Sequence, residues 1–116
     1  MSTLTLYHNP RCSTSRQALA LLRERGTEPV IVEYLKTPPD RATLQALVKA
    51  SGVPLREFLR SKEDPYKALD LGRPGVSDDE LIDAVLSHPV LLQRPIAVTA
   101  AGVRIGRPPE RVLELL

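Results

Sequence analysis

The sequence predicts an α/β protein with a four-stranded mixed sheet, in the element order β-α-β, a helical block, and then β-β-α. Two strand-like runs near the N-terminus flank a segment of helical periodicity, a pattern that indicates a parallel β-α-β unit. Two further strand-like runs near the C-terminus are separated by a tight turn, which indicates an antiparallel pair. With 116 residues, the chain is expected to form one domain over 1–116, with the helical block inserted over about 37–93.

The N-terminal part predicts strand, helix and strand in that order. Residues 3–7, "TLTLY", alternate polar and apolar side chains and indicate a half-buried strand. Residues 13–25 repeat apolar residues at helical spacing, and Gly26 is suited to ending that helix. Residues 29–34, "PVIVEY", form a β-branched run that predicts the second strand.

The middle of the chain predicts helices only. Asp40 follows a proline turn and precedes an apolar stripe, so it is the expected N-cap of a helix over 41–51. Gly52 is expected to end that helix, and short helical pieces are expected over 54–60 and 65–70.

A last helix of the inserted block is expected to begin at a capping box and to run to about Ser87. In such a box the hydroxyl of Ser77 would accept from the main chain at Glu80, and the Glu80 carboxylate would reach back.

The C-terminal part predicts a hairpin and a helix. Residues 95–99, "PIAVT", and 103–106, "VRIG", are the two expected antiparallel strands, joined by the turn "AAG". The segment "RPPERVLELL" at 107–116 predicts a helix with its prolines near the first turn. The outer parts together predict a thioredoxin-like mixed sheet with helices on both faces.

Composition limits the function classes. Hydrophobic residues make up 42% and charged residues 26%, as in a soluble globular protein, and no apolar run is long enough to span a bilayer. A formal net charge of only +2 and few aromatic residues argue against a nucleic-acid binder. One cysteine and two scattered histidines predict no metal site. A single cysteine and no signal peptide indicate a reducing cytoplasm and no membrane association.

The single cysteine, Cys12, lies in the loop "YHNPRCSTSR" between the first strand and the first helix. The N-terminus of a helix carries unpaired N–H groups and partial positive charge, which stabilise a thiolate and also bind anions. A reactive thiol and an anionic substrate could therefore share this place. The alternative is that Cys12 is a small buried apolar residue, although its close neighbours are all polar.

The neighbours of Cys12 could support this chemistry with hydroxyl donors, positive charge or a proton-transfer group. These neighbours are Ser13, Thr14, Ser15, Arg11, Arg16 and His8. For His8, a hydrogen bond that orders the loop and a catalytic proton role both remain open. Ser15 could serve only the start of the helix.

The loop "YHNPRCSTSR" resembles the active-site loop of the glutaredoxin-coupled arsenate reductase family, ArsC. The resemblance extends over nearly the whole chain: "GTEPVIVEYLKTPPD", "LREFLR", "HPVLLQRPIAVT" and "RIGRPPERVLEL" are similar to further family segments in the same order. It implies a thioredoxin-like fold with a helical insertion, and the chain is most similar to a short branch with a single cysteine.

The resemblance also implies roles for single residues. Cys12 matches the catalytic cysteine, and His8 matches a histidine that helps to keep that cysteine ionised. Arg60, Arg94 and Arg107 match the three arginines that hold the oxyanion. Several guanidinium groups and a helix N-terminus would offset the repulsion between a thiolate and an anionic substrate.

Three further positions bear on the resemblance: Pro95 supports it, Arg11 departs from it, and Asn9 concerns one of its alternatives. Pro95 matches the proline that is usually cis in thioredoxin-like folds and faces the cysteine. Arg11 stands where a small residue is expected, so it could reinforce the thiolate or change which anion fits. Asn9 stands where several related regulators have the first cysteine of a C-x-x-C switch, which argues against a redox-switch regulator without excluding a binding role.

The implied reaction is reduction of arsenate through a Cys12–arsenate adduct that glutathione and glutaredoxin resolve. With no second cysteine, the electrons must come from outside the chain. Glutathione is then a co-substrate rather than a bound cofactor, and the family precedent is a monomer. The alternatives are a glutathione-dependent thiol protein with another substrate, a non-enzymatic regulator similar to Spx, or an inactive member.

Overall fold

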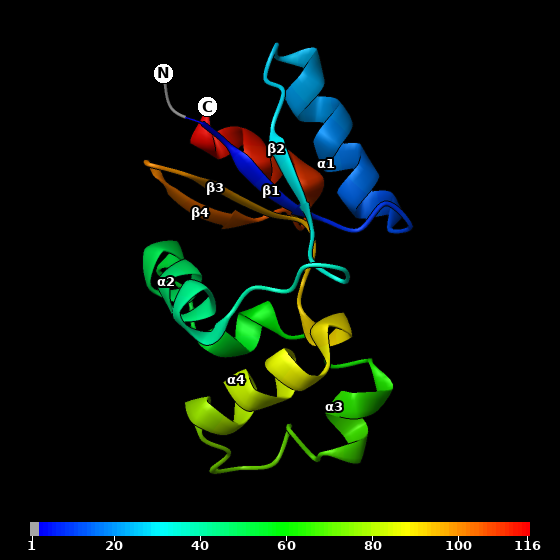
Figure 1. Ribbon diagram of the computed structural model, residues 1–116, viewed down its shortest axis with the longest axis vertical. Coiled ribbons are helices and arrows are strands. Elements are labelled where there is room, and N and C mark those ends of the chain that lie inside the picture. Colours follow the sequence, from blue (N-terminus) through cyan, green and yellow to red (C-terminus); the bar gives the residue numbers. More distant parts are fainter. Residues whose placement is uncertain (1–2) are drawn as a thin grey trace. The chain divides into compact units, whose positions relative to one another are not determined.

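The computed structural model describes residues 3–116, which form two compact units (Figure 1). The first unit holds the chain up to Thr37 together with Arg94–Leu116, and it contains the sheet. The second unit is Pro38–Gln93, and it contains helices without a strand of the sheet. None of the helices in the described part of the chain is long and apolar enough to cross a membrane.

The first unit is built on a four-stranded mixed sheet in the order β2-β1-β3-β4. Its strands are β1 (Thr5–His8), β2 (Val30–Glu33), β3 (Ile96–Thr99) and β4 (Gly102–Ile105). β1 pairs with β2 in parallel and with β3 antiparallel, and β3 and β4 form the antiparallel hairpin. The predicted thioredoxin-like mixed sheet is confirmed, with strand ends that differ from the expected ranges by at most two residues.

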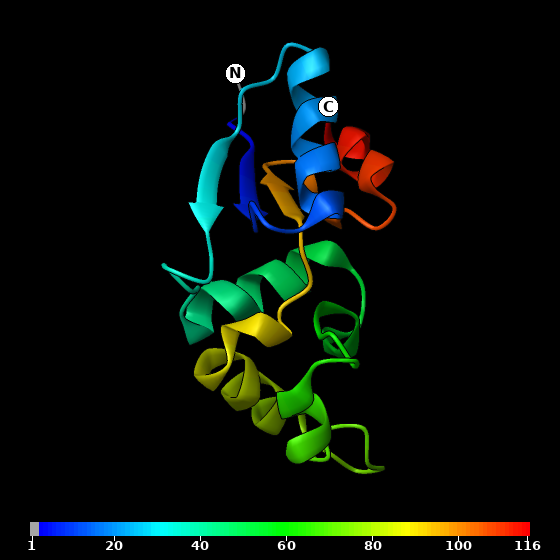
Figure 2. The same cartoon turned by 90° about the vertical axis from the view of Figure 1, so that its right-hand side faces the viewer.

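Both helical segments of the first unit pack on the same face of this sheet. They are α1 (Ser13–Glu24) and the 3₁₀ helix η3 (Pro109–Leu115), which lie beside each other in blue and red in Figure 2. One apolar cluster joins them to the sheet: Leu4, Leu6, Ala18, Leu22, Ala97, Val112 and Leu115. Fully buried leucines of this kind contribute about 1.5–3 kcal/mol each to folding.

The expectation that the outer parts place helices on both faces is therefore wrong within this unit. Leu6 and its cross-strand partner Ala97 point to one face, and the apolar stripes of α1 and η3 both pack there. Helical periodicity identifies an apolar stripe, but it carries no information about which face of a sheet that stripe will cover.

The second unit consists of three α-helices and two 3₁₀ turns. They are α2 (Arg41–Ser51), η1 (Leu55–Phe58), α3 (Asp64–Ala68), α4 (Asp78–Ser87) and η2 (Pro89–Leu91). α4 contacts α2, η1 and η2, and it buries Leu81, Ile82 and Val85. The helix expected over 41–51 is confirmed, whereas the helical piece expected over 54–60 is a single 3₁₀ turn.

Two helix caps in the second unit follow the sequence signals, one of them only in part. The Asp40 carboxylate accepts from the Thr43 N–H at 2.8 Å, and Gly52 ends α2 with a φ of 72°. At α4 the Ser77 hydroxyl accepts from the Glu80 N–H at 3.1 Å. The reciprocal half of the capping box is absent among the described residues, because the Glu80 carboxylate pairs with Arg73 instead.

The C-terminal helix is of the 3₁₀ type rather than the α type. Its N-cap is Pro108 and its first residue is Pro109. Neither proline has an N–H to donate, and Val112, three residues after Pro109, is fully buried. A 3₁₀ segment, with its i→i+3 hydrogen bonds, is compatible with this packing.

Candidate active site

Cys12 is the N-cap residue of α1, as the sequence predicts. Its backbone is extended, with φ −90° and ψ 122°, and the helix begins at Ser13. The Cys12 N–H donates to the Asn9 carbonyl at 3.0 Å, and the Cys12 carbonyl accepts from the Arg16 N–H at 3.0 Å. The thiol is partly exposed and forms no disulfide. The alternative that Cys12 is a small buried apolar residue is therefore wrong as to its burial, and its reactivity stays a prediction.

The surroundings of the sulfur lower the pKa of Cys12. Burial alone would raise that pKa, but the Ser15 N–H, the Arg94 guanidinium and the Thr14 N–H together outweigh it. The Cys12 side chain makes no capping hydrogen bond to the helix, so both N–H groups act on the sulfur as nearby dipoles of the helix start. The thiolate, which is the nucleophilic form, is consequently more populated at Cys12 than in an ordinary cysteine at the same pH.

Two arginines from the C-terminal part of the first unit converge on this sulfur. An Arg107 Nη2 atom lies 3.8 Å from Cys12 Sγ, and the Arg94 guanidinium donates to the same sulfur. Arg107 Nε also donates to the Arg94 carbonyl at 3.2 Å, which joins the two arginines to each other. The peptide bond between Arg94 and Pro95 is cis, as the resemblance implies.

His8 contacts the helix start rather than the thiol. Its Nδ1 atom lies 2.6 Å from the Ser15 hydroxyl, which also accepts from the Asn9 N–H at 3.1 Å. Burial lowers the pKa of His8, with smaller and partly opposing effects of Glu33, Arg23 and Arg16. A neutral imidazole adds no positive charge to the site, so of the two open interpretations the geometry favours the hydrogen bond that orders the loop.

The remaining loop residues divide into those that shape the loop and those that stay open to a ligand. The Asn9 amide oxygen accepts from the Arg11 N–H at 3.0 Å, and Arg16 donates to the Pro10 carbonyl at 3.0 Å. Ser15 is fully buried, so its hydroxyl is not one of the donors to substrate that the sequence suggested. Ser13 and Thr14 remain the hydroxyls that could meet a ligand at the helix start.

Arg60 belongs to the second unit. Its N–H donates to the Leu91 carbonyl at 2.7 Å, and its guanidinium pairs with the Glu63 carboxylate at 3.3 Å. Next to it, Leu59 and Leu92 form an isolated antiparallel bridge. The segment that carries Arg60 is thus hydrogen-bonded to the segment that leads into Arg94.

Gly106 supports the arginine pair and was not identified from the sequence. Its N–H donates to the Pro95 carbonyl at 2.8 Å, directly before Arg107 in the chain. A Cβ atom at this position would lie 2.7 Å from Pro95 Cγ and 2.9 Å from Val112 Cγ1. In the sequence Gly106 is an ordinary glycine at the end of a predicted strand. No local signal indicates that Pro95 and Val112 will pack directly against its Cα atom.

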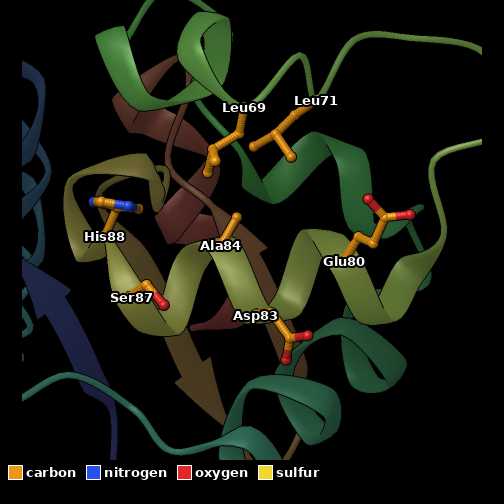
Figure 3. Close-up of a pocket in the computed structure, with 7 residues that line it drawn as sticks. All are labelled: Leu69, Leu71, Glu80, Asp83, Ala84, Ser87 and His88. Carbon is orange, nitrogen blue, oxygen red and sulfur yellow. The ribbon is translucent and has the colours of Figure 1, made fainter.

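The second unit has a cavity of about 310 Å³ between α4 and the segment that follows α3, shown in Figure 3. Its lining residues are Leu69, Leu71, Glu80, Asp83, Ala84, Ser87 and His88. The Glu80 and Asp83 carboxylates would repel an oxyanion, and the lining has no thiol. Among residues 3–116, no group of His, Cys, Asp and Glu side chains could hold a metal ion.

Comparison with known proteins identifies the family. The model of the ArsC family matches residues 7–115. The chain belongs to the ArsC family. The resemblance seen in the sequence is thereby confirmed.

Individual ArsC relatives match over nearly the full chain. An arsenate reductase of Rhizobium meliloti (strain 1021) is 51% identical over 114 residues, which are 98% of this chain and 81% of the relative. The uncharacterized protein YfgD of Escherichia coli (strain K12) is 52% identical over 96% of this chain and 94% of its own length. The solved structure of an arsenate reductase from Vibrio cholerae has a TM-score of 0.95 at 45% identity and covers 98% of both chains.

Proposed function

We propose that this protein is an arsenate reductase, with the Cys12 thiolate as its nucleophile. The observation that carries the proposal is the convergence of Arg94 and Arg107 on the only thiol of the chain, at the start of α1. A thiol that exchanges with disulfides needs no such cations, whereas arsenate is a tetrahedral anion. Membership of the ArsC family and relatives named arsenate reductase support the same conclusion.

The first step is attack of the Cys12 sulfur on arsenic. A sulfur–arsenic bond forms, and one arsenate oxygen leaves as water after taking up two protons. Two guanidinium groups and the N–H groups of the helix start offset the repulsion between the thiolate and the anion. One preorganised donor of this kind lowers a barrier by about 3 kcal/mol.

The later steps need electrons from outside the chain, because Cys12 is the only cysteine. A glutathione thiol adds to the arsenic, and a second oxygen leaves as water. A glutaredoxin thiolate then attacks the glutathione sulfur, and the electron pair of the sulfur–arsenic bond remains on arsenic, which becomes arsenic(III). Water releases arsenite from Cys12. A reducing cytoplasm is the compartment that keeps these thiols reduced.

Arg60 is proposed as the third arginine that holds the oxyanion. Its backbone is hydrogen-bonded to Leu91, three residues before Arg94. The assignment rests on the resemblance of the segment "LREFLR", which ends at Arg60, to a segment of the ArsC family. To bind the oxyanion, the Arg60 guanidinium would have to leave the weak, partly exposed pair with Glu63.

His8 is proposed as a positioning residue. It fixes the Ser15 hydroxyl at 2.6 Å and thereby the helix start, whose Ser15 N–H lowers the pKa of Cys12. Its influence on the thiolate is transmitted through Ser15.

The decisive experiment is an assay that couples arsenate reduction to NADPH oxidation through glutathione, glutathione reductase and glutaredoxin. We expect arsenate-dependent NADPH oxidation with the native protein, none with Cys12→Ser, and native turnover with Arg25→Ala, an exposed arginine at the far end of α1. Absence of turnover in the native protein, or full turnover in Cys12→Ser, would overturn the proposal.

A further inference from the structure

A second cavity adjoins the loop that leads into Cys12. It has a volume of about 170 Å³ and lies entirely in the first unit. Its lining residues come from the loop after β1 and from the turn after β2: His8, Asn9, Pro10, Arg11, Glu33, Leu35 and Lys36. A volume well below the about 300 Å³ of a drug-sized pocket suits one end of a small peptide.

Arg11 has no role within the protein that explains its charge. Its guanidinium makes no hydrogen bond or ion pair with any of residues 3–116, and only its backbone N–H is bonded, to Asn9. The groups that lower the pKa of Cys12 are Ser15, Arg94 and Thr14, and Arg11 is not among them. Arg11 is therefore not one of the groups that account for the lowered pKa of Cys12, and the suggestion that it reinforces the thiolate stays a prediction.

The other two charged residues at this cavity, Lys36 and Glu33, form only a weak ion pair with each other. Lys36 is 78% exposed in its side chain and pairs with Glu33 at 3.5 Å, a contact that contributes little in water. Pro10 and the half-exposed Leu35 supply an apolar wall. The cavity thus offers two cations for carboxylates, one carboxylate for an ammonium group, and a small apolar surface.

We propose that this cavity binds the charged end of the thiol co-substrate, a small peptide thiol with free carboxylates. This inference rests on the proposed function, because a Cys12–arsenic adduct without a second cysteine must be met by an external thiol. Arg94 and Arg107 are occupied with the sulfur and the oxyanion, so a second anionic ligand needs cations of its own. The fork of Arg11 is suited to a carboxylate, and Lys36 supports it as a point charge.

Steady-state kinetics with glutathione as the varied substrate test the inference. Arg11→Ala and Lys36→Ala should each raise the KM for glutathione several-fold, and the double variant should raise it at least about tenfold, as expected for a lost charged hydrogen bond. The KM for arsenate and the rate of Cys12 alkylation by neutral iodoacetamide should stay within about twofold of native. Arg25→Ala, a matched exposed arginine of the same unit, should change none of these values.

A second measurement is independent of arsenate. The Cys12 thiolate attacks glutathione disulfide, which forms the mixed disulfide and releases one glutathione thiolate. The double variant should slow this reaction about tenfold, and it should leave the reaction with uncharged hydroxyethyl disulfide unchanged. In the native protein, S-methylglutathione should shift the amide resonances of residues 8–11 and 33–36.

The outcomes separate this inference from the proposed function. Suppose that the native protein shows no arsenate turnover, but that the double variant still slows only the reaction with glutathione disulfide. That result would overturn the proposed function and support the proposed site. Active enzyme with an unchanged KM for glutathione in the double variant would overturn the site alone. A rise in the KM for arsenate equal to that for glutathione would also overturn it, because Arg11 would then belong to the oxyanion site.

Discussion

At the scale of single residues, the reactivity of Cys12 depends on opposing local effects. Burial by itself disfavours the thiolate, and the Ser15 N–H, the Arg94 guanidinium and the Thr14 N–H reverse that effect. Ser15 and Thr14 are sequence neighbours that any helix start would supply. The cation that contributes to this reversal, Arg94, is distant in sequence, and so is Arg107, which contacts the sulfur across 95 positions.

The pH dependence of Cys12 alkylation tests this balance. Because the pKa of Cys12 is lowered, the thiolate should persist to lower pH, and the midpoint of the iodoacetamide rate profile should lie below that of a free cysteine. Arg94→Ala should move the midpoint upward, and Arg107→Ala should move it less, because its contact with the sulfur is long. A native midpoint at or above that of a free thiol would contradict the assignment.

At the scale of elements, the connection between β4 and η3 holds Arg94 and Arg107 next to each other. Gly106 bonds to Pro95 through the backbone and leaves no room for a Cβ atom between Pro95 and Val112. Gly106 directly follows Ile105, the last residue of β4, and directly precedes Arg107. The hairpin therefore brings Arg94 and Arg107 to the same end of the sheet.

Gly106→Ala should disturb the element and the site together. Overpacking of a buried position costs about 1–3 kcal/mol, so the free energy of unfolding should fall by that amount and arsenate turnover should fall with it. Urea unfolding and the coupled assay measure the two effects. The matched substitution Gly72→Ala, whose Cβ atom would only touch Tyr66 at 3.4 Å, should change stability by less than about 1 kcal/mol. Native stability and turnover in Gly106→Ala would contradict the role of this close approach.

At the scale of the whole molecule, the chain crosses between two compact units near Thr37 and near Arg94. The helical unit, Pro38–Gln93, is about as small as the domains that fold only marginally by themselves. The expectation of a single domain over 1–116 stays a prediction, and it has a thermodynamic consequence.

Both units should unfold in one cooperative transition. Native-state hydrogen exchange of core amides in each unit, such as Leu6 in β1 and Leu81 in α4, should converge on the same free energy of opening as denaturant is added. Urea midpoints that differ between the two units would show that they are separate folding domains.

The sequence predicted most elements because their signals are local. Asp40 and Gly52 delimit α2 where expected, and the alternation or branching of the strand segments identified all four strands of the sheet. The failures concern features that local signals do not specify. The C-terminal segment has helical periodicity, which does not distinguish an α-helix from the 3₁₀ helix that the structure shows.

The sequence by itself determined that the one thiol would lie at the start of a helix, since a strand, a turn and a capped helix are encoded within neighbouring residues. Only the tertiary structure decided which groups meet that thiol. It placed Arg94 and Arg107 at the sulfur, brought His8 into hydrogen-bond contact with Ser15, and placed Arg11 at the wall of a separate cavity. The physical reason is range: capping and periodicity act within a few residues, whereas electrostatic and packing contacts depend on where the sheet brings distant segments together.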